Sequence, residues 1–147
     1  MPFVTLTAEP GGPIIDVTVG VSHPREMQLR AAREEIPAAV KVRALIDTGA
    51  SCSLITETIV KKLALPVRGV TPMHTPSTDG TAQEALIYDV SLAIDLGDQQ
   101  ARRYASLFVI GRNSMIQPGV EALIGRDILQ HAIFTFNGTA KMFLLGF

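Results

Sequence analysis

Apolar and polar residues alternate with a period of two through much of this chain, and this pattern constrains the fold more than any other feature. The longest example covers residues 85–96, and the segment 14–21 repeats it. A β-strand points successive side chains to opposite faces, so these segments indicate strands with one buried face. On the longest strand we expect the buried face to consist of Leu86, Tyr88, Val90, Leu92, Ile94 and Leu96.

Other segments are rich in β-branched and aromatic residues, which favour strands. They are residues 40–46, 104–110, 133–136 and 141–145. The dipeptide Asn137-Gly138 between the last two is typical of a two-residue hairpin turn. Aromatic side chains expected in the strand cores are Tyr88, Phe108, Phe134, Phe136 and Phe143.

Helical patterns are few. We expect a helix at 57–63, where Pro66 follows as a stop signal, and one or two helical turns at 127–131. The charged segment 24–37 fits either a short surface helix or a long loop. The sequence therefore predicts one all-β domain over residues 1–147, with one or two short helices.

Composition excludes several classes of function. The 13 Lys and Arg residues balance 14 Asp and Glu residues, so no basic patch for nucleic acid or an anionic membrane surface is expected. No apolar run reaches the ~18 residues of a membrane span. The first residues lack a secretory signal pattern, and one cysteine cannot form an internal disulfide. We expect a cytoplasmic location, without a metal because the three histidines lack metal-ligand spacing.

The most informative segment is an apolar strand that runs into the sequence Asp47-Thr48-Gly49. A rigid strand end can present a side chain to a substrate, and Gly49 lets the backbone approach a partner closely. Asp and Gly are also ordinary turn formers. Taken alone, the tripeptide fits a simple strand-ending turn as well as a site.

A second segment favours a functional site over a simple turn. Residues 122–124 are apolar, and Gly125, an Arg126-Asp127 pair and a short helical turn follow. The order of the two segments resembles that of the retropepsin-like aspartic proteases, which include the retroviral protease and its cellular and bacterial relatives. The resemblance covers most of the chain: an N-terminal hairpin, the Asp turn, a hairpin flap, the Gly-Arg-Asp segment and a closing strand.

This resemblance implies a pepsin-like half-barrel subunit that forms a C2 homodimer and cleaves peptide or protein substrates. The chain has one Asp-Thr-Gly turn, whereas the reaction needs two carboxylates, so a second copy must supply the other Asp47. The two carboxylates would share one proton and activate a water molecule between them. The implied catalytic residues are Asp47, Thr48 and Gly49, and no cofactor is required.

The resemblance also implies supporting roles. Thr48 would form a hydrogen bond across the twofold axis. A hydrophobic loop would close under the Asp-Thr-Gly turn. The guanidinium of Arg126 would be buried and would pair with the carboxylate of Asp127, unless Asp127 instead caps the helical turn that follows it. The residues expected in this support are Leu123, Ile124, Gly125, Arg126 and Asp127.

The residues after the tripeptide and the flap bear on how closely the chain follows the family. The family places Ala or Ser directly after the tripeptide, and this chain has Ala50, which cannot donate a hydrogen bond to the carboxylates, so we expect a pH optimum of roughly 5 to 6. Ser51 and Cys52 come next, where retroviral enzymes tend to carry acids. The flap region, residues 73–83, lacks a glycine-rich tip. Residues expected to bind substrate are Ala50, Ser51 and Cys52 after the turn, and Thr78, Asp79 and Gly80 in the flap.

Two alternatives remain open. The same fold could be a catalytically inactive peptide-binding or dimerisation module. It could also be a structural domain of a larger assembly, in which Asp-Thr-Gly is only a turn. The apolar terminus 143–147 has no obvious reason to face water, and a sheet formed in a dimer would cover it.

Overall fold

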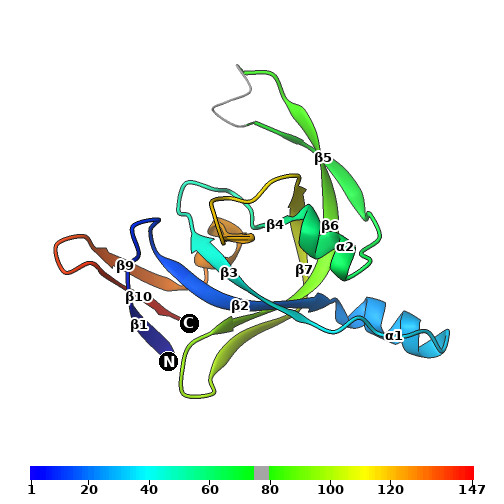
Figure 1. The fold of residues 1–147 in the computed structure, drawn as a ribbon, viewed down its shortest axis with the longest axis horizontal. Coiled ribbons are helices and arrows are strands. Elements are labelled where there is room, and N and C mark those ends of the chain that lie inside the picture. Colours follow the sequence, from blue (N-terminus) through cyan, green and yellow to red (C-terminus); the bar gives the residue numbers. More distant parts are fainter. Residues whose placement is uncertain (75–79) are drawn as a thin grey trace.

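A closed barrel of six strands forms the centre of the protein (Figure 1). The structure, a computed structural model, describes residues 1–74 and 80–147. Neighbouring strands pair around the barrel, and pairing of the first strand with the last closes it. In this order the strands are β2 (Ile14–Val21), β3 (Val40–Ile46), β8 (Ala122–Ile124), β4 (Leu54–Thr56), β7 (Ala101–Arg112) and β6 (Gln83–Asp95).

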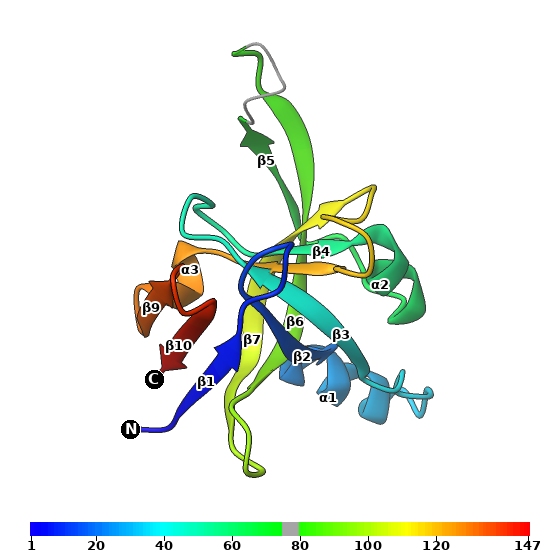
Figure 2. The ribbon, with the colours of Figure 1, turned by 60° about the vertical axis from the view of Figure 1, so that its left-hand side comes forward.

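Two further units are attached to the barrel. Strand β5 (Gly69–Met73) pairs with the first part of β6, and this hairpin stands out from the barrel (Figure 2). A separate three-stranded antiparallel sheet, which we call the terminal sheet, has the order β1-β10-β9. Its strands are β1 (Phe3–Thr7), β10 (Met142–Gly146) and β9 (Ile133–Asn137).

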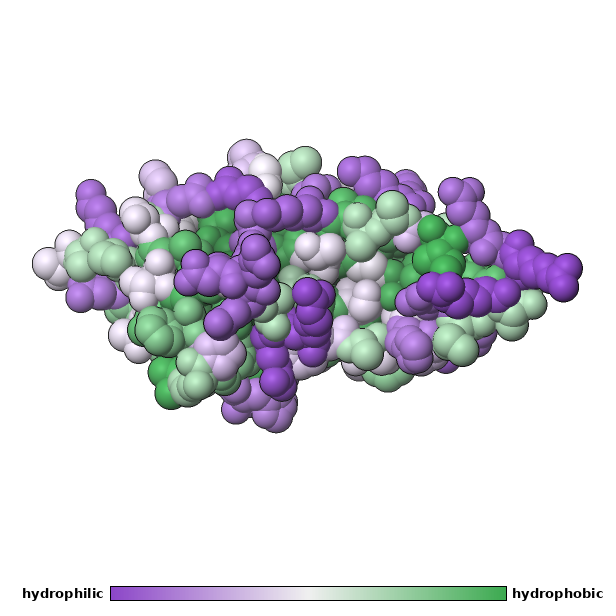
Figure 3. Space-filling view, turned by 90° about the horizontal axis from the view of Figure 1, so that it is seen from below, coloured by the Kyte–Doolittle hydropathy of each residue, from purple (hydrophilic) through white to green (hydrophobic). Residues whose placement is uncertain are grey.

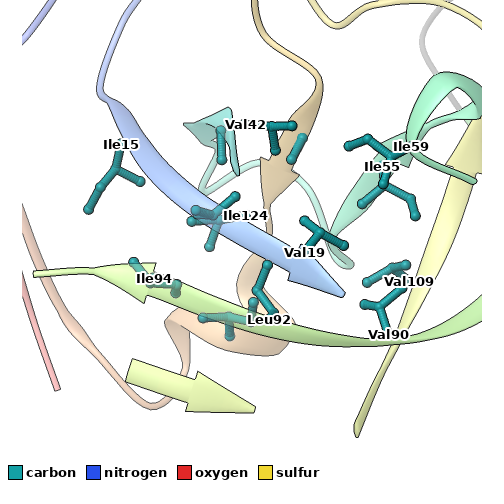
Figure 4. Close-up of a cluster of buried hydrophobic side chains, with 14 of the residues drawn as sticks. Ile15, Val19, Val42, Ile55, Ile59, Val90, Leu92, Ile94, Val109 and Ile124 are labelled. Carbon is teal, nitrogen blue, oxygen red and sulfur yellow. The ribbon is translucent and has the colours of Figure 1, made fainter. Parts of the chain in front are cut away.

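The barrel core follows from the alternating pattern. In β2, Ile15, Val17 and Val19 are almost fully buried, and they pack with residues from the other barrel strands (Figure 4). The prediction for β6 is confirmed from Tyr88 onward but is wrong for Leu86, which is 41% exposed. Leu86 pairs with β5 in the protruding hairpin, where the barrel no longer covers that face of the strand.

Three short helices connect the strands: α1 (His23–Ala31), α2 (Glu57–Lys62) and α3 (Arg126–Leu129). The expectation of one or two helices was too low, because the charged segment 24–37 folds as α1 over most of its length. There Ser22 caps the helix, its hydroxyl accepting the N–H of Arg25 at 3.4 Å, and Pro24 occupies the first turn, where no N–H partner is needed.

Three other expectations are corrected. The six strands close into a barrel rather than a half-barrel. Residues 138–141 form a four-residue connection between β9 and β10 instead of a two-residue turn, because Asn137 already pairs with Met142 and its side chain accepts the N–H of Ala140 at 2.9 Å. Phe108 and Phe136 are exposed rather than in the core, because they lie on an outer strand face and at a hairpin end, respectively.

The chain covers part of its apolar terminus by itself. Phe143 and Leu145 are fully buried because they lie on the inner face of the terminal sheet, which packs against the main core. Phe134 comes from the neighbouring strand, and its ring centroid lies 6.2 Å from that of Phe143. A partner is therefore not needed to bury these side chains.

Candidate active site

Asp47 directly follows β3 and begins a short segment, residues 47–50, which we call the Asp47 turn. Strand β8 lies between β3 and β4 and runs parallel to β3, so Leu45 and Ile46 pair with Leu123 and Ile124. The N–H of Asp47 donates to the carbonyl of Ile124 at 2.9 Å. Two buried apolar strands thus fix the position at which the aspartate leaves the barrel.

The carboxylate of Asp47 is oriented by its own turn. The N–H of Gly49 donates to Asp47 Oδ1 at 2.8 Å, and the N–H of Ala50 donates to the carbonyl of Asp47 at 3.2 Å. A Cβ at position 49 would lie only 3.1 Å from Asp47 Oδ1. The absence of a side chain at Gly49 therefore leaves room for this carboxylate oxygen. Asp47 is partly buried, whereas Thr48 and Gly49 are exposed.

Arg126 supports the turn in a different way from the one predicted. Its Nη1 donates to the carbonyl of Thr48 at 2.9 Å, and its backbone N–H donates to the carbonyl of Ala50 at 2.9 Å. The side chain is exposed, and it forms no ion pair with Asp127 among the described residues. The expected buried Arg-Asp pair is therefore wrong, because the guanidinium binds the backbone carbonyl of Thr48 instead.

Asp127 binds a residue that the sequence analysis missed. Ser53 donates its backbone N–H to Asp127 Oδ2 at 2.9 Å and its hydroxyl to Oδ1 at 2.8 Å. The N–H of Gly125 donates to the Ser53 hydroxyl at 3.1 Å, and the N–H of Ile128 donates to Asp127 Oδ1 at 2.9 Å. This network ties the start of β4 to α3. In the sequence, this role of Ser53 was indicated only by its position as a polar residue directly before the apolar residues of β4.

The backbones of residues 52 and 125 are in direct contact. A Cβ on Gly125 would lie 2.6 Å from both the carbonyl carbon and the carbonyl oxygen of Cys52. Burial raises the pKa of the Cys52 thiol, the hydrogen bond from Ser51 opposes this, and the nearby Asp127 carboxylate raises it further. A thiol with a raised pKa has little thiolate at neutral pH, which does not favour nucleophilic catalysis by Cys52.

A second apolar cluster lies beside the Asp47 turn and includes residues of the protruding hairpin. Its buried members come from β4, β6, β7 and β8, and partly buried residues border them. The buried side chains are Leu54, Ala85, Ile110 and Leu123, and the partly buried ones are Ala50, Cys52, Met73 and Ile116. This arrangement gives the neighbourhood of Asp47 an apolar, partly accessible surface.

The predicted substrate-binding residues are only partly brought together. Ala50 and Cys52 belong to the apolar cluster, while Ser51 is exposed. Thr78 and Asp79 lie outside the described residues. Gly80 is exposed, and a Cβ built there would meet nothing within 4 Å.

A cavity of about 460 Å³ lies elsewhere, between the terminal sheet and the barrel. Leu6, Ile14, Arg43 and Asp95 are among its lining residues, and none of residues 47–50 contributes to it. In the described ranges, no three His, Cys, Asp or Glu side chains gather to hold a metal ion. None of the described helices is long and apolar enough to span a bilayer.

Chemically, the Asp47 turn offers one oriented carboxylate next to an apolar surface. One oxygen receives the N–H of Gly49, and no described residue donates to the other, which leaves it available to water or substrate. A single carboxylate can act as a base or as an acid, but it cannot do both at the same moment. This carboxylate alone can therefore supply either the acid or the base of a general acid–base reaction, but not both.

Comparisons with known proteins agree with this geometry. Residues 36–128 match the family model described as aspartyl protease, and this range includes both the Asp47 turn and Gly125. A retropepsin-like aspartic protease from Rickettsia conorii has a similar fold, with a TM-score of 0.59 and 14% identity, over 99% of this chain and 90% of that one.

The retroviral protease-like domain of Ddi1 from Leishmania major is similar with a TM-score of 0.42 and 13% identity. That match covers 86% of this chain and 82% of the Leishmania chain. No curated protein sequence matches this chain.

Proposed function

Because the chain belongs to the retropepsin-like aspartic protease family, we propose that it is an aspartic endopeptidase whose active site forms when two copies bring their Asp47 side chains together. The observation that carries this proposal is the position of Asp47. The backbone N–H of Asp47 donates to the carbonyl of Ile124, and the N–H of Gly49 donates to one carboxylate oxygen, while the other oxygen receives no hydrogen bond from a described residue.

In the proposed mechanism, two Asp47 carboxylates lie close together across a twofold axis and share one proton, because two negative charges at that distance repel each other. The ionised member removes a proton from a water molecule as the water attacks the peptide carbonyl. The protonated member donates to the carbonyl oxygen, and a proton then passes to the leaving amine. The carboxyl pair thus combines the acid and the base that one chain cannot supply.

We expect an extended peptide to bind beside the Asp47 turn, under the hairpin of β5 and β6. Backbone hydrogen bonds would hold such a peptide in the manner of an added strand. Ala50, Cys52, Met73 and Ile116 are partly buried apolar side chains at the edge of the second apolar cluster, and such a surface favours apolar substrate residues near the cleaved bond. The proposed substrates are therefore peptides or proteins with apolar residues at the cleavage site.

The direct test is incubation of the protein with a mixed peptide pool at pH values from about 4 to 8, with new peptide ends identified by mass spectrometry. We expect cleavage at internal bonds between apolar residues. A peptide analogue with a secondary alcohol in place of the cleaved amide should inhibit strongly, because it resembles the tetrahedral transition state. If no peptide is cut at any pH at protein concentrations where the chain is dimeric, the proposal fails.

Ala50 provides a test of the carboxyl pair through pH dependence. In the Ala50→Ser variant, the new hydroxyl can donate to the carboxylates and stabilise their ionised form. We expect the acidic limb of the kcat/KM profile to move to lower pH by roughly one unit. The matched control is Ser51→Ala, which removes an exposed hydroxyl from the residue next to position 50. An unchanged profile, or a shift to higher pH, would contradict the expected role of position 50.

A further inference from the structure

The cavity between the terminal sheet and the barrel has the size of a small-molecule site. Its volume of about 460 Å³ falls within the roughly 300 to 1,000 Å³ of known ligand pockets. Strand β1 provides one wall, the start of β2 provides another, and the connection between β6 and β7 reaches the cavity at Gly97 (Figure 1). The lining therefore combines residues from two separate units of the fold.

One part of the lining is apolar. Val4 and Leu6 lie two residues apart on β1, so their side chains share one face of the strand, and both are partly buried against the main core. Ile14, at the start of β2, is buried. Figure 3 shows apolar side chains next to hydrophilic ones at the left-hand end of the molecule, where Figure 1 places the terminal sheet. This part of the cavity favours a ligand with a short apolar chain or ring.

The other part of the lining carries an excess of negative charge. Three carboxylates, those of Glu9, Asp16 and Asp95, line the cavity together with one cation, Arg43. The guanidinium of Arg43 already forms an ion pair with Glu9, and Arg43 lies opposite Asp16 on the neighbouring strand. The positive charge in the lining is therefore already compensated, whereas the negative charge is not.

Asp95 is the carboxylate best placed to accept a further cation. Its Oδ1 accepts the N–H of Gly97 at 2.9 Å, which orients the carboxyl group. Among the described residues, its one ion-pair partner is Lys41, which is not part of the lining. The Nζ of Lys41 lies 3.1 Å from Asp16 Oδ2 but 4.0 Å from Asp95 Oδ2. Asp95 Oδ2 can therefore accept a shorter, charge-assisted hydrogen bond from a ligand.

We propose that this cavity binds a small amphipathic amine, in which a short apolar chain or ring ends in an ammonium or guanidinium group. The cation donates to Asp95, and the apolar part of the ligand packs on the apolar side chains of β1 and β2. An anionic ligand is disfavoured, because it meets three carboxylates and has to displace Glu9 from Arg43. The site is separate from the Asp47 turn, so the proposal goes beyond peptide cleavage and does not depend on it.

The test compares three compounds with one carbon skeleton and different charges: phenylbutylamine, phenylbutanol and phenylbutyrate. Each is added to the isotope-labelled protein up to millimolar concentration, and the backbone amide signals are followed by NMR. The amine should shift the signals of Thr7 and Gly97, which line the cavity, and should bind about tenfold more tightly than the alcohol. Phenylbutyrate should leave these signals unchanged. Added salt should weaken the binding of the amine, because the charges lie at an exposed edge.

Two variants should change the affinity for the amine in opposite directions. Asp95→Asn keeps an Oδ1 acceptor for the N–H of Gly97 and should lower the affinity about tenfold, to that of the alcohol. Lys41→Gln removes an exposed cation that competes for Asp16 and Asp95, so it should raise the affinity several-fold. Asp98→Asn is the matched control for Asp95→Asn, since it removes the same charge from a nearby turn that does not line the cavity.

Three outcomes would overturn the inference. Unchanged signals around the cavity in millimolar amine would show that the cavity does not bind this class of ligand. Equal affinities for the amine and the alcohol would show that the carboxylates take no part. Equal losses in Asp95→Asn and Asp98→Asn would show only a general attraction of cations to the protein. Because the measurement is binding and not cleavage, a failure of the proposed function would leave this result unaffected.

Discussion

Replacing Asp47 with asparagine should lower kcat/KM for peptide cleavage by about a thousandfold or more, because a dimer of the variant has neither a general base nor a general acid at its centre. The fold should be retained. Asparagine has the same size, and its Oδ1 can still accept the N–H of Gly49, which now donates to Asp47 Oδ1 at 2.8 Å. The measurement is the cleavage rate of a fluorogenic peptide, together with the sedimentation mass and the unfolding temperature.

The matched control is Asp98→Asn, which removes a carboxylate from an exposed turn. Asp98 has a φ of 48°, and asparagine tolerates this left-handed backbone conformation well. Cleavage by this variant should equal that of the wild type. If Asp47→Asn keeps more than a tenth of the activity, the carboxylate is not the reacting group. If the wild type binds peptides without cutting them, the chain is a binding module with the same fold.

Much of the fold could be predicted because local patterns and tertiary packing agree. The buried faces of β2 and the second half of β6 follow from alternation, since the barrel covers one face of each strand. The same pattern was misleading at Leu86 and Phe108, because periodicity indicates which residues share a face but not whether anything packs on that face. Short strands such as β4 and β8 also escape pattern analysis, because three residues are too few to show a period.

The position of the candidate site could be predicted from the sequence, but the hydrogen bonds that support it could not be predicted as well. Asp47, Gly49 and Gly125 were found because a strand end, a turn glycine and their order along the chain are local features. The contact of Arg126 with Thr48 depends on a sequence separation of 78 residues, and the bonds between Ser53 and Asp127 depend on one of 74. No local rule indicates which acceptor a guanidinium or a hydroxyl will find at such distances.

Gly125→Ala should reduce the stability of the fold strongly. The added Cβ would lie 2.6 Å from the carbonyl carbon and oxygen of Cys52, so backbone would have to move rather than a flexible side chain. Ser53 resists this movement, since two hydrogen bonds tie it to Asp127 and its hydroxyl accepts the N–H of Gly125. Overpacking of this kind costs about 3 kcal/mol. Thermal unfolding should therefore occur roughly 6 to 12 °C lower than in the wild type.

The matched control is the same substitution at Gly69, in β5. A Cβ there would lie 3.7 Å from the side chain of Ile87, an ordinary contact, so Gly69→Ala should leave the unfolding temperature unchanged or raise it slightly. Gly125→Ala should also lower cleavage, because the displaced residues connect the Asp47 turn to β4. Equal unfolding temperatures for the two variants would show that the segments around Cys52 and Gly125 separate easily, and the Asp47 turn would then lack the rigid support that an oriented carboxyl pair requires.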